Sequence, residues 1–306
     1  MSRMPTVWLL TDNKPGHRNQ LRGLALHLEA LAGARCFWID SAAYPLSLWS
    51  ALRGKAPHLP LPPPDLVIAA GSRTHRLLLA CRRAYRAFSV VLMKPAFPLG
   101  WVDAAIIPAH DLPPERPQVL STQGVLNTIQ PVQRMPDNHQ GLMLIGGESR
   151  HFVWDGPALL PQITQICTEQ ADWQWTLTTS RRTPETFIQT LKAHCPANLH
   201  YVDHRTTPPD WLPRQLAQSG QAWVSPDSVS MVYECLSSGV PTGLFDLPPR
   251  GQGRIVRGIQ QLREQGRLTG YAQRQQLDLL HPAPPLQEAA RAAQWLLQRW
   301  RTAVAA

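Results

Sequence analysis

The chain alternates short apolar runs with amphipathic segments, and it does so twice, on either side of a polar break. Alternation at this spacing predicts parallel sheets joined by right-handed helical crossovers. It also requires strands that are buried on both faces, which suits runs rich in Val, Ile, Leu and Trp. In the first half we expect strands over 6–11, 35–40, 65–70, 88–93 and 104–108, and helices over 18–33, 45–53 and 73–86.

The polar break is "IQPVQRMPDNHQG", residues 129–141, which is typical of a linker. We therefore expect an α/β protein with two Rossmann-like domains, over 1–130 and 138–280, whose parallel sheets face an interdomain cleft. A last helix is expected over 285–303, after the stop signal "HPAPP". The elements expected in the second domain are strands over 142–145, 173–180, 199–203, 222–225 and 241–247, and helices over 157–171, 184–194, 209–219, 228–238 and 253–265.

The composition favours a globular protein with an anionic partner. Hydrophobic residues make up 43% of the 306 residues and charged residues 17%, which excludes a disordered chain. The formal charge of +9 suits a phosphate-bearing substrate or an anionic membrane surface. No dense Lys/Arg run and no zinc-finger spacing is present, so we expect no nucleic-acid partner. The nearest basic cluster, around Arg76, Arg82, Arg83 and Arg86, is equally typical of a solvated helix face.

Cysteine usage and hydropathy favour a cytoplasmic protein. The five cysteines form no C-x-x-C pair, which is typical of reduced thiols. The sequence shows no apolar core of the signal-peptide type and no run of about 18 apolar residues. The 11 tryptophans and the stretch "PLSLWSALRGK", with Leu48 and Trp49, also suit peripheral contact with the inner face of a membrane. A simple packed helix is the alternative for that stretch.

Glycines and short polar residues follow two strands of the second expected domain, at the sheet edge where open α/β proteins bind ligands. In "GGESRHF", two glycines allow close backbone approach to a ligand and the serine can donate a hydrogen bond. In "SRRTP", two arginines follow a serine and offer positive charge to a diphosphate. A Gly-Gly pair can also be no more than a turn. The candidate residues here are Gly146, Gly147, Ser149, Ser180, Arg181 and Arg182.

A third loop, "SPDSVSMVYEC", opens a helix. Asp227 or Ser228 is a suitable N-cap, and the free N–H groups at such a terminus attract phosphate. Ser230 and Glu234 share a face of this helix, where a carboxylate can accept two hydrogen bonds from ribose hydroxyls. The three loops together predict a socket for a nucleoside diphosphate, although this helix alone could be an ordinary capped helix.

The first domain offers an acid-base pair in "TDNKPGHRNQ", directly after its first strand. His17, or else Asp12, could be the base that deprotonates an acceptor hydroxyl, because histidine titrates nearest to neutral pH. Gly71 and Ser72 follow the strand over 65–70 and would line the same side of the expected cleft as His17. The alternative is that Asp12 caps the helix and His17 is a surface loop residue.

The stretches "TDNKPGHRNQ", "GGESRHF", "TSRRTP" and "SPDSVSMVYE", in this order, resemble the mitochondrial-fission ELM family over about residues 5–270. More loosely, the second half resembles the nucleotide-sugar domain of GT-B glycosyltransferases. That resemblance implies a GT-B-like fold and a role for Glu234 in binding the donor ribose. It also implies that the last helix crosses back to the first domain.

The leading hypothesis is a metal-independent glycosyltransferase of GT-B type that uses a nucleotide-activated sugar, no other cofactor, and an anionic or lipid-linked acceptor. A non-catalytic, membrane-associated adaptor and a GT-B-type nucleotide-sugar hydrolase or epimerase are the alternatives. We exclude an NAD-dependent epimerase of the short-chain type, because the loop after the first strand lacks the glycine fingerprint. No tyrosine has a lysine four residues later either.

Overall fold

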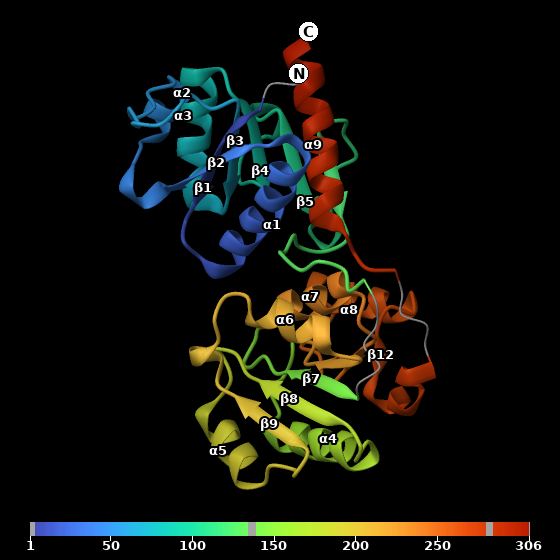
Figure 1. Ribbon diagram of the computed structural model, residues 1–306. Helices are drawn as coiled ribbons and strands as arrows, with labels where there is room; N and C mark the ends of the chain where they lie inside the picture. Colours follow the sequence, from blue (N-terminus) through green and yellow to red (C-terminus); the bar gives the residue numbers. More distant parts are fainter. Residues whose placement is uncertain (1–3, 134–138, 280–283, 306) are drawn as a thin grey trace. The chain divides into compact units, whose positions relative to one another are not determined.

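The computed structural model describes residues 4–133, 139–279 and 284–305. The chain forms two compact units. Unit 1 comprises residues 1–128 and 287–306, and unit 2 comprises residues 129–286. Each unit contains a six-stranded sheet, and all strand pairs in both sheets are parallel (Figure 1). The expected α/β class with two Rossmann-like parallel sheets is confirmed.

The sheet of unit 1 has the strand order β2-β1-β3-β4-β5-β6. The chain passes from β1 to β2 on one side and then returns to β3 on the other side of β1. The sheet therefore has a reversal point between β1 and β3, where α/β proteins bind ligands. The strands are β1 (Thr6–Thr11), β2 (Arg35–Asp40), β3 (Leu66–Ala70), β4 (Phe88–Leu92), β5 (Ala104–Pro108) and β6 (Val119–Thr122).

Helices cover both faces of this sheet. They are α1 (Pro15–Ala32), α2 (Leu48–Leu52), α3 (His75–Tyr85) and α9 (Glu288–Ala305), with the short helices η1 (Ser41–Ala43), η2 (Ser72–Thr74), η3 (Leu99–Trp101) and η4 (Ala109–Asp111).

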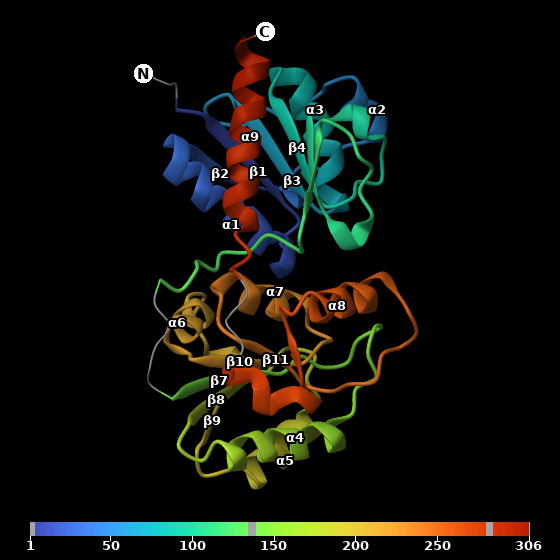
Figure 2. The same ribbon diagram turned by 90° about the vertical axis from the view of Figure 1, so that its right-hand side faces the viewer.

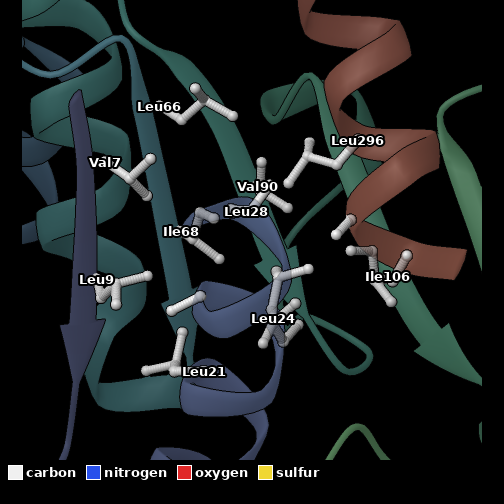
Figure 3. Packing of buried hydrophobic residues seen from close by; sticks show 14 of the residues in the cluster. Val7, Leu9, Leu21, Leu24, Leu28, Leu66, Ile68, Val90, Ile106 and Leu296 are labelled. Atoms are coloured by element: carbon white, nitrogen blue, oxygen red, sulfur yellow. The ribbon is translucent and has the colours of Figure 1, made fainter. Parts of the chain in front are cut away.

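Alternation along the strands of unit 1 produces two buried clusters, one on each face of the sheet. Val7 and Leu9 of β1 join α1 and α9, whereas Trp8 and Leu10 join α2 and α3. Figure 3 shows the first cluster, which contains Leu296 of α9 together with residues of α1 and the sheet. The last helix of the chain is therefore part of the core of unit 1.

Unit 2 has the strand order β12-β11-β10-β7-β8-β9, with its reversal point between β7 and β10. Helices α6, α7 and α8 lie on one face of the sheet, and α4 and α5 lie on the other (Figures 1 and 2). The strands are β7 (Gln140–Leu144), β8 (Gln174–Thr178), β9 (Leu199–Val202), β10 (Gln221–Val224), β11 (Thr242–Leu244) and β12 (Thr269–Gly270). The helices are α4 (Gly156–Glu169), α5 (Glu185–Ala193), α6 (Trp211–Gln218), α7 (Val229–Ser238) and α8 (Arg254–Glu264), with η5 (His204–Thr206) and η6 (Tyr271–Leu279).

The structure departs from the sequence-based expectations at the starts of two helices and in two short strands. Helix α1 begins at Pro15 rather than at residue 18, because proline lacks an N–H and its fixed φ suits the first helical position. His17 therefore lies in the first turn of a helix and not in a loop. Strands β6 and β12 were not expected. The predicted linker over 129–141 lies partly outside the described residues, and α9 begins at Glu288 rather than at residue 285.

Candidate functional site

The loops that follow β7 and β10 meet at the reversal point of unit 2. The Gly146 N–H donates to Ser225 Oγ at 2.7 Å, and the Gly147 N–H donates to Asp227 Oδ2 at 2.8 Å. A Cβ atom at Gly146 would overlap the Asp227 carboxylate, and one at Gly147 would overlap the backbone of Arg182. The glycine pair thus permits close packing of three loops.

Arg182 ties these loops together. Its Nη1 donates to the carbonyl oxygens of Gly147 at 3.1 Å and Glu148 at 2.6 Å, and its Nη2 lies 2.9 Å from Asp227 Oδ2. The Asp227 side chain is 1% exposed and that of Arg182 is 41% exposed. Two of its nitrogens therefore bond protein groups. The neighbouring Arg181 is exposed.

The hydroxyl groups singled out in the sequence also shape these loops. Ser180 Oγ donates to the Gly146 carbonyl at 2.8 Å, and Thr183 Oγ1 bonds the same oxygen. Ser149 Oγ accepts from the backbone N–H groups of His151 at 3.2 Å and Phe152 at 3.1 Å. Ser225 was not predicted as a site residue, although it lies in a quoted stretch directly after its strand.

Helix α7 starts at the same reversal point without a side-chain cap. Ser228 is the N-cap residue, but its side chain makes no capping hydrogen bond, and the Asp227 carboxylate faces Gly147 and Arg182 instead. The N–H groups of the first turn therefore have no side-chain acceptor and offer a positive end to an anion. Ser230 is exposed in this turn, and Glu234 lies half-buried one turn further along the same face.

The reversal point of unit 1 holds the acid-base pair. His17 Nδ1 lies 2.8 Å from Asp12 Oδ1, which also accepts from the Lys14 N–H at 3.2 Å. The Asp12 side chain is 1% exposed and that of His17 is 22% exposed. Helix α1 has Lys14 as its N-cap and no side-chain cap, so Asp12 does not cap the helix.

Asp12 is ionised despite its burial. Burial raises the pKa of the Asp12 carboxyl, but hydrogen bonds from His17 and Lys14, together with the charges of both, outweigh it and leave the pKa below its ordinary value. An ionised carboxylate only accepts hydrogen bonds, so Nδ1 of His17 donates the proton of this contact. Asp12 therefore orients the ring, and His17 is the more exposed side chain of the two.

Gly71, directly after β3, makes room for this pair. A Cβ atom there would lie 2.5 Å from His17 Nδ1 and 2.6 Å from Asp12 Oδ2, and the residue has φ +94°. Ser72 follows as an exposed residue at the start of η2. Residues predicted from the sequence therefore lie together around two reversal points, one in each unit.

The pattern of the family described as mitochondrial fission ELM1 matches residues 15–300. The chain belongs to this family. No curated protein sequence matches it. Within this ELM1-family chain, no helix of the described part is long and apolar enough to cross a membrane. Its described residues also contain no group of three or more His, Cys, Asp or Glu side chains that could hold a metal ion.

Several solved structures share the fold of this ELM1-family chain over nearly its whole length. A putative UDP-N-acetylglucosamine 2-epimerase from Listeria monocytogenes matches with a TM-score of 0.65 and 12% identity, over 99% of this chain and 97% of that one. The UDP-GlcNAc 2-epimerase from Methanocaldococcus jannaschii matches with a TM-score of 0.57 and 10% identity, over 96% and 99%. The Neisseria meningitidis enzyme, bound to UDP-GlcNAc, matches with a TM-score of 0.56 and 10% identity, over 97% and 99%. The expected GT-B-like fold is confirmed.

Proposed function

We propose that this ELM1-family chain is a metal-independent glycosyltransferase of GT-B type, which moves a sugar from a nucleoside diphosphate to an acceptor hydroxyl. The observation that carries the proposal is the buried, ionised Asp12 against Nδ1 of His17. This arrangement leaves Nε2 as an oriented base, as in other catalytic sites where a carboxylate fixes the tautomer of a histidine.

In the proposed reaction, His17 Nε2 takes the proton of the acceptor hydroxyl while that oxygen bonds to the anomeric carbon of the donor. The bond between this carbon and the diphosphate oxygen breaks, and the nucleoside diphosphate leaves with the bonding electrons. General-base assistance of this kind contributes about 10²- to 10⁴-fold to the rate. Asp12 is a positioning residue that also stabilises the imidazolium formed in this step.

We assign the donor to the reversal point of unit 2. The uncapped N-terminus of α7 and the exposed Arg181 would neutralise the diphosphate, both as it binds and as it leaves. Glu234 would accept hydrogen bonds from the ribose. The structurally similar enzyme from Neisseria meningitidis is bound to UDP-GlcNAc, which supports this choice of ligand class.

The acceptor we propose is anionic or lipid-linked, and the enzyme would meet it as a peripheral protein at the inner face of a membrane. The net charge of +9 and the 11 tryptophans support this class of acceptor. The alternatives are an epimerase, which the shared fold favours, a nucleotide-sugar hydrolase, and an adaptor without catalysis.

The test combines binding with turnover. A thermal-shift screen with UDP, GDP, ADP and CMP sugars should raise the melting temperature for one nucleotide. That donor is then incubated with a cell-envelope lipid extract, and nucleotide release and sugar incorporation are both followed. We expect release that depends on the extract and is lost in His17→Ala. Release without extract would indicate a hydrolase, a changed sugar without release an epimerase, and no shift with any nucleotide an adaptor.

A further inference from the structure

Helix α2 of unit 1 presents two large apolar side chains to solvent. Leu48 is 48% exposed and Trp49 is 73% exposed, and they are consecutive residues at the start of the helix. Neighbouring exposed apolar side chains of this size, when surrounded by polar groups, mark an interaction surface more often than a random position does. Only Ala51 of this helix is buried, so Leu48 and Trp49 are not part of the core. The alternative of a simple packed helix therefore does not explain them.

The chain around α2 is strongly basic. Residues 41–102 contain a single acidic residue, Asp65, whose carboxylate accepts the Thr6 N–H at 2.9 Å. Arg53 and Lys55 follow α2 directly, and both are exposed. The segment therefore carries a large excess of positive charge. Its basic residues are Arg53, Lys55, Arg73, Arg76, Arg82, Arg83, Arg86 and Lys94.

Two cations of α3 contact the backbone at the two ends of α2. Arg76 Nη1 donates to the Leu46 carbonyl at 3.0 Å, and the Arg83 guanidinium donates to the Leu52 carbonyl. Both arginines are exposed. Arg82, in contrast, pairs with Asp103 and is not available in the same way. The exposed apolar pair is therefore flanked by positive charge from two helices.

We propose that the α2 surface, defined as Leu48, Trp49, Arg53, Lys55, Arg76 and Arg83, docks on an anionic lipid surface. Tryptophan prefers the boundary between headgroups and acyl chains, and basic residues beside it are attracted to anionic headgroups. A nucleic acid would bind the cations, but it would not explain the exposed side chain of Leu48. A lipid surface would be a partner of the proposed transferase. The inference nevertheless rests on the contacts of α2 and α3, and it can be tested without nucleotide or acceptor.

The experiment measures flotation of the full chain with vesicles of phosphatidylcholine, alone or with one third phosphatidylglycerol. The wild-type chain should bind the anionic vesicles at low salt and dissociate as salt screens the headgroups. Leu48→Ser with Trp49→Ser should abolish most of this binding. Arg53→Gln with Lys55→Gln should weaken it about fivefold for each cation removed.

Matched controls are available on α9, which covers the opposite face of the sheet. Val304 is 66% exposed and Arg301 is also exposed, so Val304→Ser with Arg301→Gln removes similar groups elsewhere. This control should bind vesicles like the wild type, and circular dichroism should show that all variants are folded. The proposal is overturned if the wild-type chain ignores anionic vesicles, if both α2 variants bind normally, or if only duplex DNA is bound. Vesicle binding by a chain that binds no nucleotide would contradict the proposed function alone.

Discussion

At the scale of single residues, Gly71 is the position on which the Asp12–His17 pair depends. Its φ of +94° is one that side chains with a Cβ rarely adopt, and a Cβ atom there would collide with both partners. The Gly71→Ala variant should therefore displace the pair and reduce turnover by about 10²- to 10⁴-fold, the range of general-base assistance. Steady-state kinetics on the donor found in the thermal-shift screen measures this loss.

Gly16 is the matched control for that variant, because a Cβ atom there meets nothing within 4 Å. Gly16→Ala in the first turn of α1 should keep nearly full activity. Wild-type turnover in Gly71→Ala, with the fold verified, would mean that the pair takes no part in the reaction.

Alanine substitution of Arg182 should mainly affect stability, whereas alanine substitution of Arg181 should mainly affect nucleotide binding. Removing Arg182 leaves the buried Asp227 carboxylate without its guanidinium, which should lower the free energy of unfolding by about 1–3 kcal/mol. Removing the exposed Arg181 should change that free energy by less than about 0.5 kcal/mol. It should nevertheless weaken binding of a nucleoside diphosphate far more than binding of the nucleoside. Urea denaturation and calorimetry separate the two effects, and equal stability losses would contradict the assignment.

At the scale of helices and strands, the sequence was sufficient for most elements because each buried strand is an apolar run between polar loops. The short strands β6 and β12 were not predicted, because four and two residues respectively are too few to show a hydrophobic pattern. Nothing in the sequence distinguishes Arg181 from Arg182, because only the strand order brings Asp227 beside one of them. The same order, which places β1 against β3 and β7 against β10, decides where the two candidate sites lie.

The contact between α3 and the strands β4 and β5 should depend on pH. Asp103 accepts from Arg82 at 2.9 and 3.2 Å, and from Ser89 Oγ at 2.6 Å. Burial raises the pKa of the Asp103 carboxyl. These hydrogen bonds and the charge of Arg82 lower this pKa by more than burial raises it, so the net shift is downward. A carboxylate with a lowered pKa stabilises the fold when the pH is above the ordinary pKa of aspartate, about 4. This contribution is lost as the pH falls through the lowered pKa.

The measurement is the free energy of unfolding from neutral pH to below pH 4. The free energy of unfolding of the wild type should fall across the acid range. That of Asp103→Asn should be lower at neutral pH and should fall by less. Glu115→Gln, which removes an exposed carboxylate of the same unit, should follow the wild-type curve. An Asp103→Asn curve parallel to the wild-type curve would show that this carboxylate does not stabilise the fold.

At the scale of the whole molecule, the last helix belongs to the unit that begins the chain. Leu296 of α9 is fully buried in the cluster that contains α1. Leu296→Ala should destabilise unit 1 by about 2–5 kcal/mol, the usual range for such a cavity. Hydrogen exchange should then accelerate in β1 and β3 but not in β7 and β10. Faster exchange in both units alike would contradict the assignment of α9 to unit 1 alone, and Val304→Ala is the exposed control.

The proposed function requires above all that unit 2 bind a nucleoside-diphosphate sugar through α7. Isothermal titration calorimetry of the UDP, GDP, ADP and CMP sugars, with the wild-type chain, Glu234→Ala and His17→Ala, tests this most directly. We predict saturable binding of one nucleotide, weakened about 10- to 150-fold in Glu234→Ala, as expected for the loss of a charge-assisted hydrogen-bond pair, and nearly unchanged in His17→Ala. Unchanged affinity in Glu234→Ala, or no binding of any nucleotide sugar by the wild type, would contradict it.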